Sequence, residues 1–185
     1  LNTKTASSSN ESLVTATATG KATGTLLIEG VSQLATSATA VGTPQVPVTS
    51  STKLSSLFNG NMPSEIELGS INAQGELGER VKITIDENTT ISQFISKVNS
   101  SNAGVSAIFE NGQLSITAKN TGRLANGDSA IQMNDAAKNV FGELGITKVN
   151  EGQNASFKVN GIETERSSNA FSINGYNVTL KATFN

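Results

Sequence analysis

The residues best suited to chemistry are two pairs of glutamates, Glu65/Glu67 and Glu163/Glu165, each spaced i, i+2. Alternate residues of a strand point to the same side, so each pair would present two carboxylates on one face. Paired carboxylates can hydrolyse a glycosidic bond, but only when they line a cleft at a suitable separation. Because glutamate is ordinarily a solvated surface residue, we interpret each pair as the exposed face of a strand.

A second candidate for chemistry is Asp86-Glu87-Asn88, which begins like a calcium loop. Position 6 of that template would be Ile91 instead of glycine and position 12 would be Lys97 instead of glutamate, so the EF-hand pattern fails. The better interpretation is a turn that leads into a helix. The chain also contains no cysteine and no histidine, the usual ligands of zinc, copper and haem. We therefore expect no metal site and no cofactor.

Catalysis by a serine nucleophile lacks its usual base, because the chain has no histidine. The segment Gly20-Lys21-Ala22-Thr23-Gly24 does not have the spacing of a phosphate-binding loop, so its glycines are better suited to a turn. We identify no catalytic residue in the sequence, and we expect the protein not to be an enzyme.

Composition restricts the partners. The formal net charge is −2 and Lys and Arg are scattered, so the chain lacks the basic patch that nucleic acid or an anionic membrane surface would attract. No run of apolar residues is long enough to span a bilayer. Ser and Thr are abundant, as is common in extracellular proteins, and aromatic residues are few. A core built from Val, Ile, Leu and Ala favours thin β layers.

The two ends of the chain predict strands. Residues 13–19 alternate apolar and threonine side chains, and residues 25–31 form a denser apolar run. Near the other end, Phe157-Lys158-Val159-Asn160-Gly161 and Phe171-Ser172-Ile173-Asn174-Gly175 repeat one pattern, and Asn-Gly favours a tight hairpin turn. Two successive hairpins are therefore expected, after a flexible lead-in over residues 1–11.

The middle of the chain predicts helices as well as strands. Residues 36–52 contain Pro44 and Pro47 and are interpreted as a connection, followed by a short helical turn over residues 54–58. An apolar stripe predicts helices over residues 90–99, with a capping box at Thr90, and over residues 135–144, with Asn134 as N-cap. Strands are expected at the ranges 66–68, 81–85, 105–109, 113–118 and 131–133.

These elements predict a mainly β protein with an α+β insertion. One β domain is assigned to residues 12–48 and 149–185, and a compact α+β domain with two short helices is inserted at residues 49–148. Both ends of the chain would then fold together, and the middle would form an excursion from one loop.

Two parts of the sequence resemble the flagellar hook-associated protein 2 family, the cap at the tip of the bacterial flagellar filament. The first is the end of the chain, where Phe157–Gly161, Arg166–Asn169 and Gly175–Leu180 match the family's pattern. The second is the block around the helix that ends at Val98-Asn99, followed by Ala103-Gly104-Val105, which is similar to the short flagellin-hook motif. The common form of that motif has Ile-Asn at the helix end.

The resemblance implies a structural, non-enzymatic cap protein at the extracellular tip of the filament, exported without a cleavable Sec signal. It implies self-association into a ring-like cap and a role in folding and inserting flagellin subunits. Because residue 1 is Leu, we expect a head-region fragment of a longer protein, monomeric or weakly oligomeric by itself. An extracellular adhesin or glycan-binding β module, with a host surface or mucin as partner, is the alternative.

Overall fold

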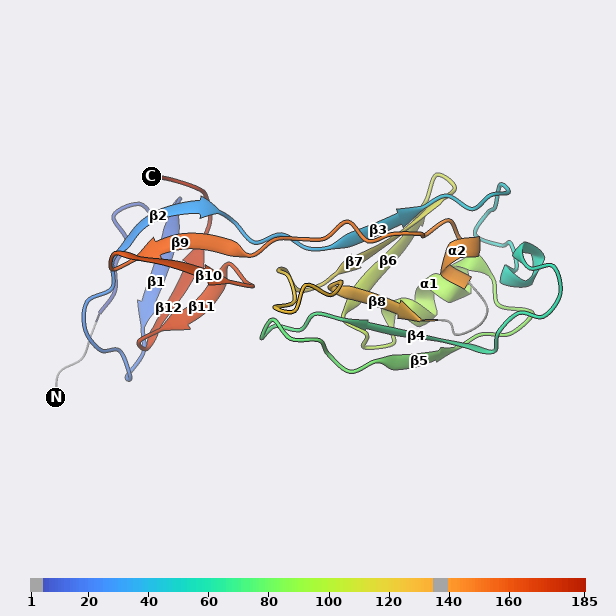
Figure 1. Cartoon of the computed structure of the whole chain (residues 1–185), viewed down its shortest axis with the longest axis horizontal. Helices are drawn as coiled ribbons and strands as arrows, with labels where there is room; N and C mark the ends of the chain where they lie inside the picture. Colours follow the sequence, from blue (N-terminus) through green and yellow to red (C-terminus); the bar gives the residue numbers. More distant parts are fainter. Residues whose placement is uncertain (1–4, 135–139) are drawn as a thin grey trace. The chain divides into compact units, whose positions relative to one another are not determined.

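The computed structural model describes residues 5–134 and 140–185. The chain folds into two compact units (Figure 1). The first contains Leu1–Thr36 and Gln153–Asn185, and the second contains Ser37–Gly152. The sequence-based fold class, mainly β with an α+β insertion, is confirmed.

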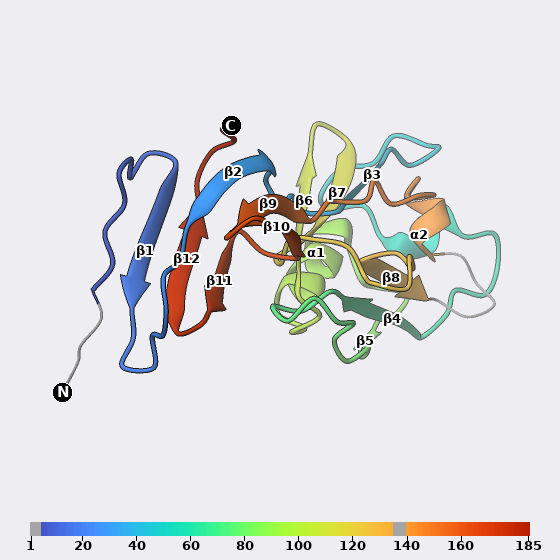
Figure 2. The same cartoon turned by 60° about the vertical axis from the view of Figure 1, so that its left-hand side comes forward.

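The first unit contains two antiparallel sheets of three strands. One sheet has the order β1-β12-β11, formed by Val14–Ala18, Tyr176–Leu180 and Ala170–Ile173 (Figure 2). The other has the order β10-β9-β2, formed by Ile162–Arg166, Ala155–Val159 and Ile28–Gln33. Each sheet thus combines strands from both ends of the chain.

A shared core lies between these two sheets. Phe157 on β9 is almost fully buried and stacks on Phe171 of β11, with ring centroids 4.8 Å apart. Val14, Val31 and Val178 belong to the same apolar cluster. The alternation of apolar and polar residues along each strand puts these side chains on the inner faces.

The two expected hairpins of the first unit are confirmed. The φ angles are 48° and 81° at Asn160 and Gly161, and 49° and 81° at Asn174 and Gly175. Two consecutive positive φ angles in a two-residue loop are those of a type I′ turn, which Asn-Gly adopts most readily. The turns fix the pairing of β9 with β10 and of β11 with β12.

The second unit also contains two three-stranded antiparallel sheets. One has the order β3-β7-β6, formed by Thr39–Gly42, Gln113–Ala118 and Val105–Glu110. The other has the order β5-β4-β8, formed by Val81–Thr84, Glu65–Ser70 and Ile131–Asn134. The helical elements are η1 (Leu54–Leu57, a 3-10 turn), α1 (Ile91–Asn99) and α2 (Val140–Glu143).

Helix α1 forms where its apolar stripe predicts. Ile91, Phe94 and Val98 are buried, and Phe94 meets Phe141 of α2 edge to face, with centroids 6.3 Å apart. The expected capping box is present: Thr90 Oγ1 accepts from Gln93 N at 3.1 Å, and Gln93 Oε1 accepts from Thr90 N at 3.0 Å. These reciprocal bonds satisfy backbone donors that the first turn would otherwise leave unpaired.

Two expectations about the middle of the chain need correction. The segment 36–52 is not only a connection, because it contains strand β3, which pairs with β7 from Thr39↔Thr117 to Gly42↔Leu114. The division between units falls after Thr36, not at the expected 48/49, and before Gln153, not at 148/149. The physical reason is burial: Ala38 and Ala40 are fully buried in the core of the second unit.

Part of the expected second helix, over residues 135–139, lies outside the described residues, as do the side chain of its expected N-cap Asn134 and residues 1–4 of the lead-in. In the part that is described, α2 ends before Gly145, whose φ is +81°. None of the helices in the described ranges has the length and apolar content needed to cross a membrane.

Candidate interaction surfaces

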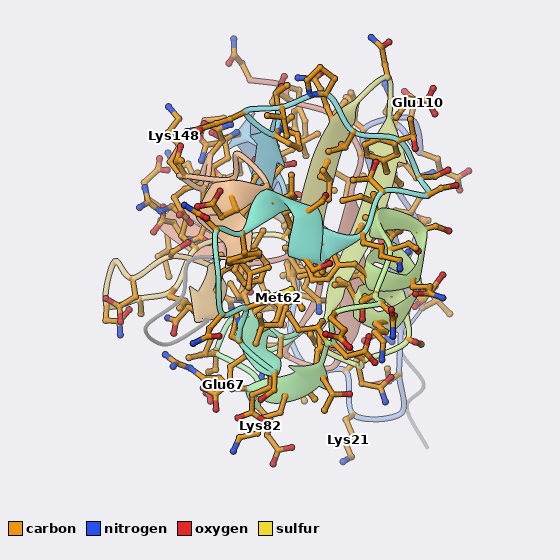
Figure 3. The ribbon with its side chains drawn as sticks, turned by 90° about the vertical axis from the view of Figure 1, so that its right-hand side faces the viewer. Lys21, Met62, Glu67, Lys82, Glu110 and Lys148 are labelled. Carbon is orange, nitrogen blue, oxygen red and sulfur yellow. The ribbon has the colours of Figure 1, made fainter. Side chains whose placement is uncertain are left out.

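The glutamate pairs singled out in the sequence lie on strand surfaces. Glu65 and Glu67 are on β4, where Glu65 is 3.8 Å from Lys82 Nζ and Glu67 is opposite Lys82 in the register. Figure 3 shows Glu67 and Lys82 projecting together from the outer rim of the ribbon. Glu65 is exposed and paired with a flexible lysine, so this arrangement is that of a solvated strand face.

The second pair belongs to the edge strand β10. Glu163 and Glu165 are both exposed. Glu163 is opposite Lys158 in the β9–β10 register, and Glu165 accepts a long bond of 3.4 Å from Ser156 Oγ. Each carboxylate therefore has a polar neighbour on β9: Lys158 for Glu163 and the Ser156 hydroxyl for Glu165. Glu163 and Glu165 therefore lie on an open sheet surface.

Asp86 forms the expected turn before α1. Its Oδ1 accepts from Asn88 N at 2.8 Å and from Thr89 Oγ1 at 3.3 Å, and its own N–H donates to Thr89 Oγ1 at 2.9 Å. These local bonds use the carboxylate to close a turn of the Asx type. Within residues 5–134 and 140–185, no cluster of three or more potential metal ligands is present.

Asn99 holds the connection from α1 to β6 in place. This role was not predicted from the sequence. Asn99 Oδ1 accepts from Ala107 N at 2.7 Å, and its Nδ2 donates to Ala107 O at 2.9 Å. The side-chain amide thus pairs with β6 as a neighbouring strand would. This contact occupies backbone groups on the outer edge of the sheet, where an unpaired strand can attract other chains.

Ser70 and Gly104 hold the other end of the same connection. Ser70 is 3% exposed, and its Oγ donates to Ala103 O at 2.7 Å. Gly104 has a φ of +79°, and a Cβ at this position would press on the Ser70 hydroxyl. The tight turn before β6 therefore needs a glycine. Its spacing after the helix was visible in the sequence, whereas the contact with Ser70 was not.

The outer face of the β3-β7-β6 sheet in the second unit contains two exposed apolar side chains, Val41 and Ile108. Ser115 lies opposite Val41 on one side and Ile108 on the other, so the three side chains form one row across the strands. Val41 and Ile108 are 48% and 58% exposed. The next row consists of hydroxyl side chains, with Thr39 Oγ1 and Thr117 Oγ1 3.2 Å apart.

Charged side chains border this face: Glu110 lies at its hairpin end, which Figure 3 shows at the tip of β6–β7, and the exposed Lys119 follows Thr117 at the other end of β7. We refer to Thr39, Val41, Ser106, Ile108, Ser115 and Thr117 as the uncharged face. This surface was not predicted, because strand β3 was not expected and its pairing with β7 creates the row.

In the first unit, Asn169 plays a part similar to that of Asn99. Its Oδ1 accepts from Ala35 N at 2.7 Å and its Nδ2 donates to Ala35 O at 3.0 Å. Its backbone carbonyl also accepts from Leu180 N at 2.7 Å. Asn169 therefore joins the segment that follows β2, through its side chain, to β12, through its backbone.

Comparison with known proteins identifies this architecture. The D2–D3 domains of the flagellar cap protein FliD from Serratia marcescens superpose with a TM-score of 0.71 at 22% identity, covering 94% of this chain and 95% of that one. The fold is that of the FliD D2–D3 domains. The corresponding FliD domains from Escherichia coli give a TM-score of 0.70 at 21% identity, covering 94% and 90% of the two chains.

FliD (HAP2) from Pseudomonas aeruginosa PAO1 superposes with a TM-score of 0.62 at 20% identity, over 93% of this chain and 80% of that one. A family model, the flagellin hook IN motif, matches residues 70–120. The resemblance of the α1 block to this motif is thus confirmed, and the matched range includes Ser70, Asn99 and Gly104. No curated protein matches the chain by sequence.

Proposed function

We propose that this chain is the head region of a flagellar filament cap protein. The observation that carries the proposal is the coincidence of two independent similarities. The chain has the FliD D2–D3 fold over 94% of its length, and the flagellin hook IN motif falls within the inserted unit. In the complete protein the head would belong to a ring-like cap at the distal end of the filament, where flagellin subunits fold and are inserted.

The side chains are compatible with a structural role. The glutamates that could have performed acid–base chemistry lie on open strand surfaces beside Lys82 and Lys158. The absence of cysteine from the sequence suits a protein that passes unfolded through a narrow export channel, because a disulfide would obstruct threading. Such a protein would reach the extracellular filament tip without a cleavable Sec signal.

Within this proposal, the uncharged face is where we place the contact between cap subunits. Its rows, Val41–Ser115–Ile108 and Thr39–Thr117–Ser106, contain no charged residue. Two identical copies could therefore approach through this face without bringing like charges together, which is costly at an interface. The small apolar area agrees with the expected weak self-association of the isolated chain, since stable interfaces bury considerably more surface.

A domain exchange tests the proposal. This chain would replace the D2–D3 segment of Escherichia coli FliD, and the chimera would be expressed in a strain that lacks its own FliD. We expect filaments and swimming to be restored, whereas an unrelated β domain of similar size in the same place should restore neither. The proposal is overturned if the chimera is stable and exported but supports no filament, or if the unrelated domain works equally well.

The subunit contact has its own matched pair of variants. In the chimera, Ile108→Lys puts a charge into the uncharged face, and Ile162→Lys makes the same change at an exposed isoleucine of the first unit. We expect only Ile108→Lys to shorten filaments. Equal effects of the two variants would refute the assignment of the face. The adhesin alternative predicts instead that the isolated chain retains binding to glycans or mucin.

A further inference from the structure

The chain contains five Asn-Gly dipeptides, the sequence most prone to spontaneous deamidation. The backbone nitrogen of the glycine attacks Cγ of the asparagine, a bond from N to Cγ forms, and the side-chain nitrogen leaves as ammonia. Water then opens the resulting succinimide to give aspartate or isoaspartate. Glycine favours the reaction because it has no Cβ to hinder the attack. The five asparagines are Asn59, Asn111, Asn126, Asn160 and Asn174.

Folding can suppress this reaction in two ways. Hydrogen bonds to the side-chain amide prevent it from turning towards the glycine nitrogen, and a hydrogen bond from the glycine N–H occupies the nucleophile. A site held in this manner reacts only after a local opening, whose free energy lowers the rate. The five sites differ strongly in this respect.

Hydrogen bonds restrain both the side-chain amide of Asn160 and the backbone nitrogen of Gly161 that would attack it. Its Oδ1 accepts from Leu27 N at 2.7 Å, its Nδ2 donates to Thr25 O at 2.7 Å, and the N–H of Gly161 donates to the Glu29 carboxylate. These bonds also explain why β2 begins at Ile28, since the residues before it pair with the Asn160 side chain. Deamidation of Asn160 therefore requires the hydrogen bonds between the Asn160–Gly161 turn and residues 25–29 to break.

Asn126 is held within its own turn. Its Oδ1 accepts from Asp128 N at 3.0 Å, its Nδ2 donates to Asp128 Oδ2 at 3.1 Å, and Gly127 N donates to Leu124 O at 3.1 Å. The amide and the nucleophile are therefore both occupied. We expect this site to be protected as well.

Asn111 and Asn174 occupy type I′ turns with φ angles of 50° and 49°. The strands on either side of each turn are in register, so rotation of the asparagine towards its glycine would strain the hairpin. Asn174 is further restrained, because its carbonyl accepts from Thr23 N and a Cβ on Gly175 would overlap the Lys21 backbone. These two sites should react at intermediate rates, with Asn111 the faster.

Asn59 has none of these restraints. It is exposed, follows η1, and lies outside the strand pairings. Within residues 5–134 and 140–185, no hydrogen bond holds its side chain or the N–H of Gly60. Gly60 has a φ of +117°, and a Cβ there would meet no atom within 4 Å. We propose that Asn59 is the preferred deamidation site of the folded protein.

The modification would change the charge of a defined part of the surface. Gly60 lines the same shallow hollow as Asp86 and Glu87. Conversion of the Asn59 amide to a carboxylate would add a negative charge next to Gly60, at the border of a hollow that already contains two acidic residues. Formation of isoaspartate would also lengthen the backbone of the loop by one methylene group.

The experiment compares the folded chain with the same chain in denaturant. Samples incubated at neutral pH are digested, and the extent of deamidation at each of the five sites is followed by mass spectrometry. In denaturant all five should react at similar rates, because they share one dipeptide. In the folded chain, Asn59 should react nearly as fast as in denaturant. Asn126 and Asn160 should be slower by at least about tenfold, which corresponds to about 1.4 kcal/mol of local opening free energy.

Two variants identify which asparagine gives rise to the deamidated protein, without the need for digestion. Asn59→Gln should abolish the early acidic form seen on ion exchange, because glutamine would have to close a six-membered imide, a much slower reaction than formation of the five-membered succinimide. Asn111→Gln, at another exposed Asn-Gly, should leave that early form unchanged. The proposal is overturned if Asn126 or Asn160 reacts as fast as Asn59 in the folded chain, or if Asn111→Gln removes the early form.

Discussion

The side chain of Asn99 takes the place of a strand beside Ala107. One amide group accepts from the Ala107 N–H at 2.7 Å and donates to its carbonyl at 2.9 Å. Residues 105, 107 and 109 of β6 direct their backbone groups away from β7, because the intervening residues pair with that strand. The last residue of α1 therefore fixes the position of the helix along the sheet and covers part of its edge.

Replacement of Asn99 should destabilise the second unit. Asn99→Ala removes two hydrogen bonds and leaves the backbone groups of the buried Ala107 without their partner, a loss of about 1–3 kcal/mol in the free energy of unfolding. Asn99→Asp also places a carboxylate oxygen against the Ala107 carbonyl. Urea denaturation measures both variants. Asn61→Ala, at an exposed asparagine, should stay within about 0.5 kcal/mol of the parent.

A similar asparagine in the first unit allows a local test. Asn169→Ala removes the two bonds to the backbone of Ala35, so the Ala35 amide should exchange its hydrogen faster. An increase of about tenfold is expected if the lost bonds contribute about 1.4 kcal/mol. Hydrogen exchange followed by mass spectrometry or NMR gives this rate. An unchanged rate at Ala35 would show that Asn169 does not hold this segment.

Two glycines separate the cost of backbone strain from the cost of close packing. Gly145 and Gly127 have nearly equal φ angles, +81° and +84°, but a Cβ on Gly145 would overlap the Thr43 carbonyl, whereas one on Gly127 would meet nothing within 4 Å. Gly127→Ala should cost about 1 kcal/mol from its positive φ. Gly145→Ala should cost at least about 2 kcal/mol more because β3 must move. Similar melting temperatures for the two variants would contradict this difference.

The glutamate pairs should be dispensable for stability. Glu65 and Lys82 are exposed, so Glu65→Gln and Lys82→Ala should each change the free energy of unfolding by less than about 1 kcal/mol, and a double-mutant cycle should give a small coupling. Glu163→Gln serves as the matched change in the other unit. A glycosidase activity that disappears in either glutamine variant would instead restore the catalytic interpretation.

Sequence patterns predicted elements whose information is local. The capping box at Thr90, the apolar stripe of α1 and the Asn-Gly turns each depend on residues a few positions apart, and all were found where expected. Strand β3 was missed because Thr39–Gly42 is short and gains its apolar environment from β7, more than seventy residues away. The uncharged face and the Asn99 contact were missed for the same reason, since both require knowledge of which strands pair.

The aromatic stack of the first unit provides a final test of how that unit holds together. Phe157 is 1% exposed and stacks on Phe171, so Phe157→Ala removes a large buried side chain from between the two sheets. We expect a loss of about 3–5 kcal/mol in the free energy of unfolding. Ile162→Ala, five residues away at a 64% exposed position, should change it by less than about 0.5 kcal/mol. If truncation of Phe157 were as mild as that of Ile162, Phe157 would not be a main support of the contact between the β9 and β11 sheets.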